Sequence, residues 1–341
     1  MHTVEFKLEN VCRALIGRGA LQYAGEVCLE HVPGRKLALI TEDGVPEEHI
    51  RACIAVLEGS GFHAAPIVFR GGERSKTIPT LLEVYEGLYS AGLTRTDGAV
   101  GLGGGVALDM AGFAAATYLR GIPFISLPTT VIAQTDSAFG GKTGVDLNEG
   151  KNYVGVFRQP NAVVCDTAFL STLPEAERIC GMGEIIKYGA IAEPSILDEV
   201  GRGLPSDETV ALCADIKRRF VEADEFDTGE RRILNFGHTF GHAAEAASGY
   251  SIPHGQAVAY GMLAMIRAGE RLGVTEAGVF GAIERACIKA GLDTDYAPLI
   301  DKALPLLGRD KKSDGVMIDA VLLKRLGEPM RMKLPISALE G

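Results

Sequence analysis

The chain has 341 residues, of which 47% are hydrophobic and 23% charged, and this composition excludes a disordered protein. A formal net charge of −10 with no dominant basic stretch argues against nucleic-acid binding. Asp109 and Arg120 interrupt the most hydrophobic region, so we expect no membrane-spanning segment. The length predicts two domains.

The chain begins with a strand-like alternation of apolar and polar residues over residues 1–10, so we expect no signal peptide. The cysteines are scattered, form no CxxC pair and are odd in number. Such a pattern is typical of free thiols in a reducing compartment, and we expect a cytoplasmic protein. The seven are Cys12, Cys28, Cys53, Cys165, Cys180, Cys213 and Cys287.

Residues 1–167 alternate short apolar runs with stretches of helical periodicity, among them residues 46–61 and 79–92. Repeated strand–helix–strand order predicts a largely parallel sheet covered by helices, which is a Rossmann-like α/β domain. The expected buried strands are residues 36–41, 64–69, 98–104, 123–129 and 162–167.

Residues 168–341 are mostly helical in period, with one possible strand near residues 316–323. No low-complexity linker separates the halves, so we expect two abutting domains with the active site in a cleft between them. The expected helices of the second domain are residues 174–191, 206–225, 237–249 and 256–273.

The glycine-rich segment GLGGGVALDMAGF, residues 101–113, follows an expected strand and leads into an expected helix. Consecutive glycines let backbone N–H groups approach a phosphate, and a helix N-terminus adds partial positive charge. Alone the segment is equally typical of an ordinary turn, because Val106 occupies the last glycine position of G-x-G-x-x-G. Residues 71–76 and the pair Thr129 and Thr130 lie at two further strand ends, and the three loops together favour a nucleotide.

Residues 133–155 are short of aliphatic bulk and are either a solvated loop or a glycine-rich segment that runs through the protein. The apolar flanks favour the second interpretation. Lysine and asparagine donors in such a segment suit phosphate and carboxylate recognition. Its polar side chains include Asp136, Lys142, Lys151 and Asn152.

His238 and His242 are four residues apart in NFGHTFGH and share one face of the expected helix. Such a pair is more often a surface or capping pair than a metal site. Two features favour a metal: His254 directly precedes another helix, and Glu184 lies on an apolar helix, where a lone carboxylate is costly to bury. Two histidines with one carboxylate are a common catalytic zinc arrangement, but spacing leaves open which of His238 and His242 is the ligand.

Seven motifs in order between roughly residues 36 and 325 resemble the 3-dehydroquinate synthase family. They are GGGVALDMAGFAAATYLRGIPF, PTTVIAQTDSAFGGKTGVD, GKNYVGVFRQP, LPEAERICGMGEIIKYGAI, ADEFDTGERRILNFGHTFGHAAE, PHGQAVAYGM and RDKKSDG. The resemblance implies the family's fold, an NAD-binding α/β domain followed by a helical metal- and substrate-binding domain, and a homodimer. It also implies that Glu184, His238 and His254 bind one divalent metal ion, Zn²⁺ or Co²⁺, while His242 belongs to the substrate site.

The resemblance implies two further sets of residues. Arg120 matches an arginine that reaches the neighbouring subunit's site in the family dimer. The substrate set is Asp136, Lys142, Asn152, Lys187, Lys217, Arg231, Asn235 and one of Lys311 or Lys312. The NAD⁺ set is Glu42, Glu73, Lys76, Gly104, Gly105, Asp109, Thr129, Thr130, Lys142, Lys151, Phe169 and Thr172.

The implied reaction converts the sugar phosphate 3-deoxy-D-arabino-heptulosonate 7-phosphate into 3-dehydroquinate and phosphate, a step of the shikimate pathway to aromatic amino acids. It comprises transient oxidation by NAD⁺, elimination of phosphate, re-reduction, ring opening and intramolecular aldol closure. NAD⁺ is therefore recycled. We expect Lys187, three residues after Glu184, to contact the reacting hydroxyl.

Three positions depart from the family pattern. Leu108 replaces a usual glycine in the glycine-rich turn, which predicts an altered approach to the pyrophosphate. Glu42 and Gly44 replace an expected aspartate and asparagine at the adenosine ribose. Gly183 replaces a usual alanine beside the metal ligand Glu184, which predicts added backbone freedom.

Three alternatives remain open. A sister sugar-phosphate cyclase, such as an aminodehydroquinate synthase or a sedoheptulose 7-phosphate cyclase, would share most of these residues. A metal-dependent polyol dehydrogenase would accumulate NADH and would give no role to so many lysines. A non-catalytic descendant would have lost metal ligands, whereas Glu184, His238 and His254 are all present.

Overall fold

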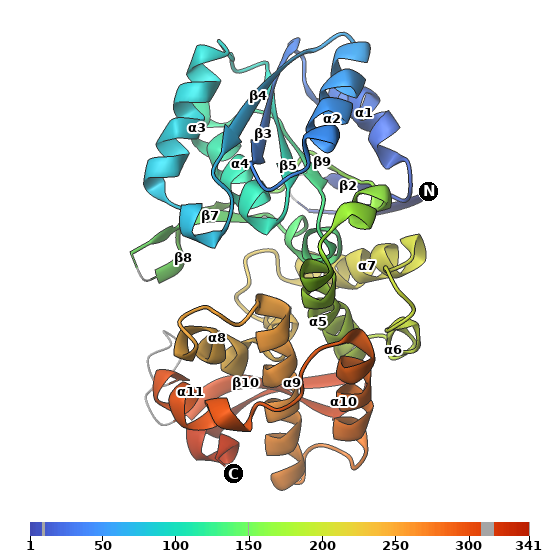
Figure 1. Ribbon diagram of the computed structural model, residues 1–341, viewed down its shortest axis with the longest axis vertical. Helices are drawn as coiled ribbons and strands as arrows, with labels where there is room; N and C mark the ends of the chain where they lie inside the picture. Colours follow the sequence, from blue (N-terminus) through green and yellow to red (C-terminus); the bar gives the residue numbers. More distant parts are fainter. Residues whose placement is uncertain (9–10, 149, 308–316, 341) are drawn as a thin grey trace. The chain divides into compact units, whose positions relative to one another are not determined.

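The computed structural model describes residues 1–8, 11–148, 150–307 and 317–340, and the chain divides into two compact units (Figure 1). The first unit comprises residues 1–173 and 206–226, and the second comprises residues 174–205 and 227–341. Among the described residues, no helix is long and apolar enough to cross a bilayer.

A seven-stranded sheet forms the centre of the first unit, in the strand order β1-β2-β9-β6-β5-β3-β4. Within this sheet, β1 and β2 pair antiparallel. All the other neighbouring strands of the sheet are parallel, as the strand–helix alternation predicts. The strands are β1 (His2–Phe6), β2 (Cys12–Ile16), β3 (Lys36–Glu42), β4 (His63–Phe69), β5 (Gly98–Gly103), β6 (Phe124–Pro128) and β9 (Ala162–Cys165).

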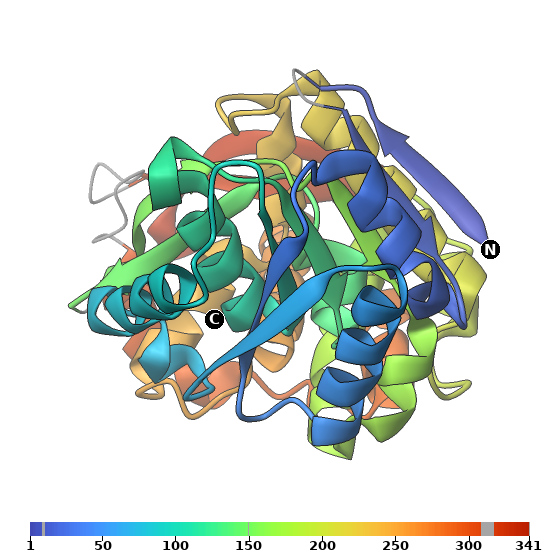
Figure 2. The same ribbon diagram turned by 90° about the horizontal axis from the view of Figure 1, so that it is seen from above.

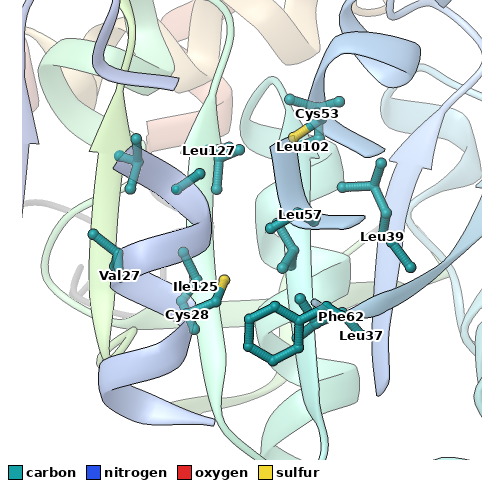
Figure 3. Close-up of a cluster of buried hydrophobic side chains, with 14 of the residues drawn as sticks. Val27, Cys28, Leu37, Leu39, Cys53, Leu57, Phe62, Leu102, Ile125 and Leu127 are labelled. Atoms are coloured by element: carbon teal, nitrogen blue, oxygen red, sulfur yellow. The ribbon is translucent and has the colours of Figure 1, made fainter. Parts of the chain in front are cut away.

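Helices cover both faces of this sheet (Figure 2). On β3, Leu37 and Leu39 point into the cluster beneath α1 and α2 (Figure 3), whereas Ala38 and Ile40 point into the cluster beneath α3 and α4. Side chains of a strand alternate between faces, so a continuous apolar run is buried on both sides. The helices are α1 (Ala24–His31), α2 (Glu47–Gly59), α3 (Ile78–Ser90) and α4 (Gly105–Thr117).

Helix α7 (Asp207–Ala223) also belongs to the first unit, although its sequence lies within the helical half of the chain. Val210, Ala214 and Val221 of α7 share a buried cluster with Val4 and Phe6 of β1. The apolar face of β1 is therefore covered by a helix from far along the chain.

The segment at residues 133–155 is a short π-helix followed by an antiparallel hairpin, which neither interpretation of the sequence predicted. Its glycines permit tight pairing: a Cβ on Gly144 would lie 2.5 Å from the carbonyl oxygen of Val154. The elements are the π-helix Ala133–Ser137, β7 (Lys142–Leu147) and β8 (Gly150–Phe157).

The second unit is mainly helical, as predicted, and contains one two-stranded sheet. The strand expected near residues 316–323 is β10, whose partner β11 was not predicted. The helices are α5 (Glu175–Ile191), α6 (Ile196–Glu199), α8 (His238–Ala247), α9 (His254–Arg271), α10 (Val279–Ala290) and α11 (Ile300–Leu307), and the strands are β10 (Met317–Arg325) and β11 (Glu328–Pro335).

Candidate active site

Three side chains from three helices of the second unit converge on one point. Glu184 lies on α5, and His238 and His254 are the first residues of α8 and α9. The carboxylate oxygen Oε1 of Glu184 is 3.4 Å from Nε2 of His238 and 3.2 Å from Nε2 of His254. All three ligand atoms lie within 4.8 Å of one another.

These distances fit one divalent metal ion. Ligand atoms about 2.0–2.1 Å from zinc at tetrahedral angles are about 3.3 Å apart, which matches the spacing of the two histidine nitrogens from Glu184 Oε1. The second ring nitrogen of His238 also suits metal binding. Nδ1 is 3.2 Å from the carbonyl oxygen of Phe236, so it can donate a hydrogen bond there and leave the lone pair of Nε2 for the metal.

The helix starts and a close crossing put these residues in place. Gly237 precedes His238 with a positive φ of 82°, which favours glycine at the entry to α8. Helices α5 and α9 approach so closely that a Cβ on Gly183 would lie 2.3 Å from the carbonyl oxygen of Gly255. This crossing brings Glu184 beside His254. Gly183 is therefore needed for the approach of two backbones, and the added backbone freedom expected from the sequence is not its main effect.

Neighbouring charges shift the pKa values of two members of this group, Glu184 and His254. Burial raises the pKa of Glu184, but the ammonium of Lys187 and the ring of His238 outweigh this and hold it well below its usual value. Burial lowers the pKa of His254, but Glu184 and Glu245 outweigh this and raise it to about 10. A metal ion that binds here must therefore displace a proton from His254.

Lys187 lies one turn along α5 from Glu184, is 1% exposed, and forms an ion pair with the Glu184 carboxylate. A cation held beside the three candidate ligands can contact an oxygen bound at the same point. Arg231 and Asn235 lie on a neighbouring 3-10 helix, Glu230–Asn235, and Arg231 is buried.

The structure gives His238 and His242 different surroundings. The ring of His242 is exposed, and its centroid is 5.3 Å from that of His238 and 6.1 Å from that of His254. His242 is not a member of the three-ligand group around Glu184. It belongs to a second group of possible metal ligands, with Glu245 and His254. Glu245 is not among the residues predicted from the sequence, although it follows His242 by three residues on the same face of α8.

In the first unit, Lys76 joins members of the two implied ligand sets. Its buried ammonium donates to Asp109 Oδ2 and to Asn152 Oδ1, each at 2.5 Å. Burial lowers the pKa of Lys76, but Asp109 and Glu73 outweigh this and raise it, so the side chain remains a cation. Asn152 has a positive φ of 53° and donates its backbone N–H to Asp146 at 2.6 Å.

Other implied NAD⁺ residues surround the strand ends of the first unit. Gly104 and Gly105 begin α4, Thr129 donates its N–H to the carbonyl of Gly103, and Glu42 accepts from the N–H of Gly72. Thr130 caps the next turn through its hydroxyl. A Cβ on Gly104 would lie 3.2 Å from Thr130, so little room remains for a side chain there. Leu108 is buried in the core cluster with Phe6, so its side chain does not occupy the turn itself.

Phe169 and Thr172 are held together by His49, which the sequence analysis did not single out. The imidazole of His49 packs 4.6 Å from the ring of Phe169 and is 2.8 Å from the hydroxyl of Thr172. Burial lowers the pKa of His49. Nothing in the local sequence distinguishes His49 from its polar neighbours on α2, because its partners lie far along the chain.

Polar residues of the substrate set also meet in the first unit. Lys217 donates to the backbone carbonyl of Asp136 at 2.6 Å and to its carboxylate at 2.9 Å. A small pocket is lined in part by Asp109 and Lys142, and Lys151 is paired with Glu73 at 3.6 Å.

Arg120 ends the short 3-10 turn Tyr118–Arg120 that follows α4. Arg120 is exposed, and both it and Leu119 have positive φ angles, 68° and 52°, which side-chain-bearing residues rarely adopt. Lys311 and Lys312 lie outside the described residues.

Comparison with known proteins gives consistent matches. Residues 66–180 match the family model 3-dehydroquinate synthase N-terminal, and residues 181–313 match 3-dehydroquinate synthase C-terminal. The 3-dehydroquinate synthase of Streptococcus sanguinis (strain SK36) is 41% identical over 336 residues, covering 96% of this chain and 95% of that protein.

Solved structures of sugar-phosphate cyclases have the same fold. A 2-deoxy-scyllo-inosose synthase complexed with carbaglucose-6-phosphate, NAD⁺ and Co²⁺ has a TM-score of 0.91 and 26% identity, covering 99% of this chain and 98% of that one. The 2-epi-5-epi-valiolone synthase of Streptomyces hygroscopicus subsp. jinggangensis 5008, with NAD⁺ and Zn²⁺ bound, has a TM-score of 0.85 and 23% identity, covering 96% and 94%.

Proposed function

The chain belongs to the 3-dehydroquinate synthase family, and we propose that it catalyses that family's reaction. It converts 3-deoxy-D-arabino-heptulosonate 7-phosphate into 3-dehydroquinate and phosphate, in the shikimate pathway. The observation that carries the proposal is the group of Glu184, His238 and His254 with the buried cation of Lys187 beside it. A metal site with an adjacent fixed cation suits an anionic substrate whose hydroxyl must be oxidised.

Glu184, His238 and His254 would hold the metal ion, Zn²⁺ or Co²⁺, and the first unit would hold NAD⁺. When bound, the metal supplies a Lewis acid and NAD⁺ supplies a reversible hydride acceptor. Lys187 then orients the reacting hydroxyl from the side of Glu184. Its fixed ammonium stabilises negative charge on that oxygen without reorganisation of solvent.

The remaining substrate residues provide the charge that a carboxylate and a phosphate require. Five are cations or imidazoles and three are neutral or acidic groups that fix orientation, so together they hold a flexible sugar phosphate in one conformation. We assign this role to Asp136, Lys142, Asn152, Lys217, Arg231, Asn235, His242 and one of Lys311 or Lys312.

In this proposal the first unit would provide the NAD⁺ contacts, which include Phe169 and Thr172, and the second unit would provide the metal ligands. The NAD⁺ residues in this proposal are those implied by the family resemblance, among them Glu42, Glu73, Lys76 and Asp109.

We also propose a homodimer and a cytoplasmic location. The paired positive φ angles at Leu119 and Arg120 support a functional role for this exposed turn, since such backbone strain is retained where the side chain is needed, here in the partner's site. All seven cysteines are buried and free, which supports a reducing compartment.

The test is release of phosphate from 3-deoxy-D-arabino-heptulosonate 7-phosphate by the metal-loaded protein with catalytic NAD⁺, while NADH absorbance is followed. We expect many turnovers, no lasting NADH signal, and loss of activity in EDTA. Absence of phosphate release would contradict the proposal. Release from the aminated substrate or turnover of sedoheptulose 7-phosphate instead would indicate a sister cyclase, and net NADH formation from a polyol would indicate a dehydrogenase.

Replacing Lys76 with methionine is expected to weaken NAD⁺ binding by about tenfold or more, which corresponds to about 1.4 kcal/mol. The change removes the cation that holds both Asp109 and Asn152, so the KM for the sugar phosphate should rise as well. Isothermal titration with NAD⁺ and steady-state kinetics measure the two effects.

Lys36→Met is the matched control for Lys76→Met. Lys36 lies in the first unit outside both implied ligand sets, and its ammonium donates to the carbonyl oxygen of Gly92 at 2.9 Å. Equal losses of NAD⁺ affinity in the two variants would contradict a special role for the buried Lys76 network.

A further inference from the structure

A buried carboxylate faces the side of His254 that points away from Glu184. Glu245 lies two turns along α8 from His238 and is 4% exposed. Its Oε1 is 3.5 Å from Nδ1 of His254, while Nε2 of the same ring is 3.2 Å from Glu184. The imidazole therefore lies between two carboxylates, one at each nitrogen.

This arrangement selects one tautomer of His254. A neutral imidazole carries one N–H, and a nitrogen that binds a metal must present its lone pair. Because an ionised carboxylate only accepts hydrogen bonds, Glu245 favours the proton on Nδ1. Nε2 is then the metal-binding nitrogen, and it is the one directed at Glu184.

The other histidine ligand is oriented by a different kind of group. Nδ1 of His238 faces the backbone carbonyl of Phe236 at 3.2 Å, which no side-chain substitution removes. The orientation of His254 depends instead on a side chain from another helix. The contact joins α8 to the first residue of α9 and restricts the rotation of the His254 ring.

From this geometry we propose that Glu245 is a positioning residue, which holds His254 in the metal-binding tautomer and orientation and thereby sets the affinity of the metal site. The inference rests on the metal site of the proposed function. It concerns metal affinity, which is measured without any substrate, so its failure is distinguishable from an error in the assigned reaction.

The competing interpretation is a second cation site. His242, Glu245 and His254 have ligand atoms within 4.8 Å of one another, and such a site would use Nδ1 of His254. A cation there would bind the nitrogen that the positioning role requires to be protonated. The two interpretations therefore predict different metal stoichiometries.

The experiment measures Zn²⁺ affinity by competition with a chromophoric chelator in Glu245→Ala and Glu245→Gln. Loss of a residue that orients a metal ligand typically weakens metal binding by about 10–100-fold, and we expect this for Glu245→Ala. Glu245→Gln should lie between Glu245→Ala and the unchanged protein, because its amide oxygen still accepts from Nδ1–H but carries no charge. The visible absorption bands of the Co²⁺-loaded variants should shift as the position of His254 changes.

Glu270→Gln is the control, since Glu270 is a carboxylate on α9 that pairs with Arg267 at 3.0 Å far from the metal ligands. Its Zn²⁺ affinity and Co²⁺ bands should be unchanged. Thermal unfolding of each metal-free variant shows whether it is folded. If Glu245→Ala is not folded, Glu245→Gln alone tests the proposal. Unchanged Zn²⁺ affinity in both Glu245 variants would overturn the proposal. So would the loss of a second, weaker Zn²⁺ equivalent with the first unaffected, which would identify a second cation site.

Discussion

Replacing Glu184 with glutamine should abolish tight metal binding and reduce phosphate release by at least about 1,000-fold, because removal of metal-ion catalysis forfeits several kcal/mol of stabilisation of the transition state. Glu184 is the one anionic member of the three-ligand group and faces both histidine nitrogens. Metal content after dialysis and steady-state phosphate release measure the two losses.

The same change should destabilise the metal-free protein. Glu184 is fully buried and the ammonium of Lys187 beside it is 1% exposed, so Glu184→Gln leaves that cation next to a neutral amide. Breaking one partner of a buried ion pair costs about 3–5 kcal/mol. Urea unfolding of the metal-free proteins measures this difference.

The double variant Glu184→Gln with Lys187→Met separates the two effects. It removes both buried charges, so stability should recover in large part while metal binding and activity remain absent. A Glu184→Gln protein that still binds one metal ion tightly would show that the three-ligand group is not the metal site.

The parallel sheet was predictable because its strands are buried on both faces. Residues 36–41 and 98–104 are short, continuous apolar runs, and such runs between helical stretches have few other interpretations. The hairpin of β7 and β8 was not predictable in the same way. Lys142 and most of β8 are at least partly exposed, and Gly144 and Gly155 make the pattern resemble a loop.

For the candidate site, the sequence predicted a histidine–carboxylate group but not its detailed contacts. Helical spacing puts His238 and His242 on one face, so their different surroundings depend on where α5 and α9 cross, which is tertiary information. The family resemblance supplied the distinction. The role of Glu245 required the position of His254 relative to α8, although its spacing from His242 was visible in the sequence.

Gly183 shows why a local rule was insufficient. A glycine in a helix suggests added backbone freedom when the sequence is considered alone. In the structure the backbone of α9 passes close to it, and a Cβ would lie 2.3 Å from the carbonyl oxygen of Gly255. The partner backbone belongs to a segment some seventy residues later in the chain, so no local pattern reveals the contact.

Gly255→Ala should therefore be among the most damaging glycine substitutions around the metal ligands. A Cβ on Gly255 would lie 1.7 Å from the carbonyl oxygen of Cys180 on α5, and neither backbone can yield as a flexible side chain would. Overpacking costs typically 1–3 kcal/mol and more where backbones must move, so we expect a loss of about 3 kcal/mol despite the better helix propensity of alanine. Urea unfolding of the metal-free protein measures it.

The steric change should reach the metal site because Gly255 directly follows His254 at the start of α9. Moving α9 away from α5 separates His254 from Glu184, now 3.2 Å apart, so Zn²⁺ affinity should fall together with stability. Gly189→Ala is the control on α5: its Cβ would meet side chains and no backbone, with Cδ2 and Cγ of Leu197 at 2.6 and 2.9 Å. If Gly255→Ala lost stability but kept full Zn²⁺ affinity, the close crossing would serve packing alone. A joint loss would establish that the approach of two glycine-bearing helices is what brings the carboxylate and the histidine to metal-binding distance.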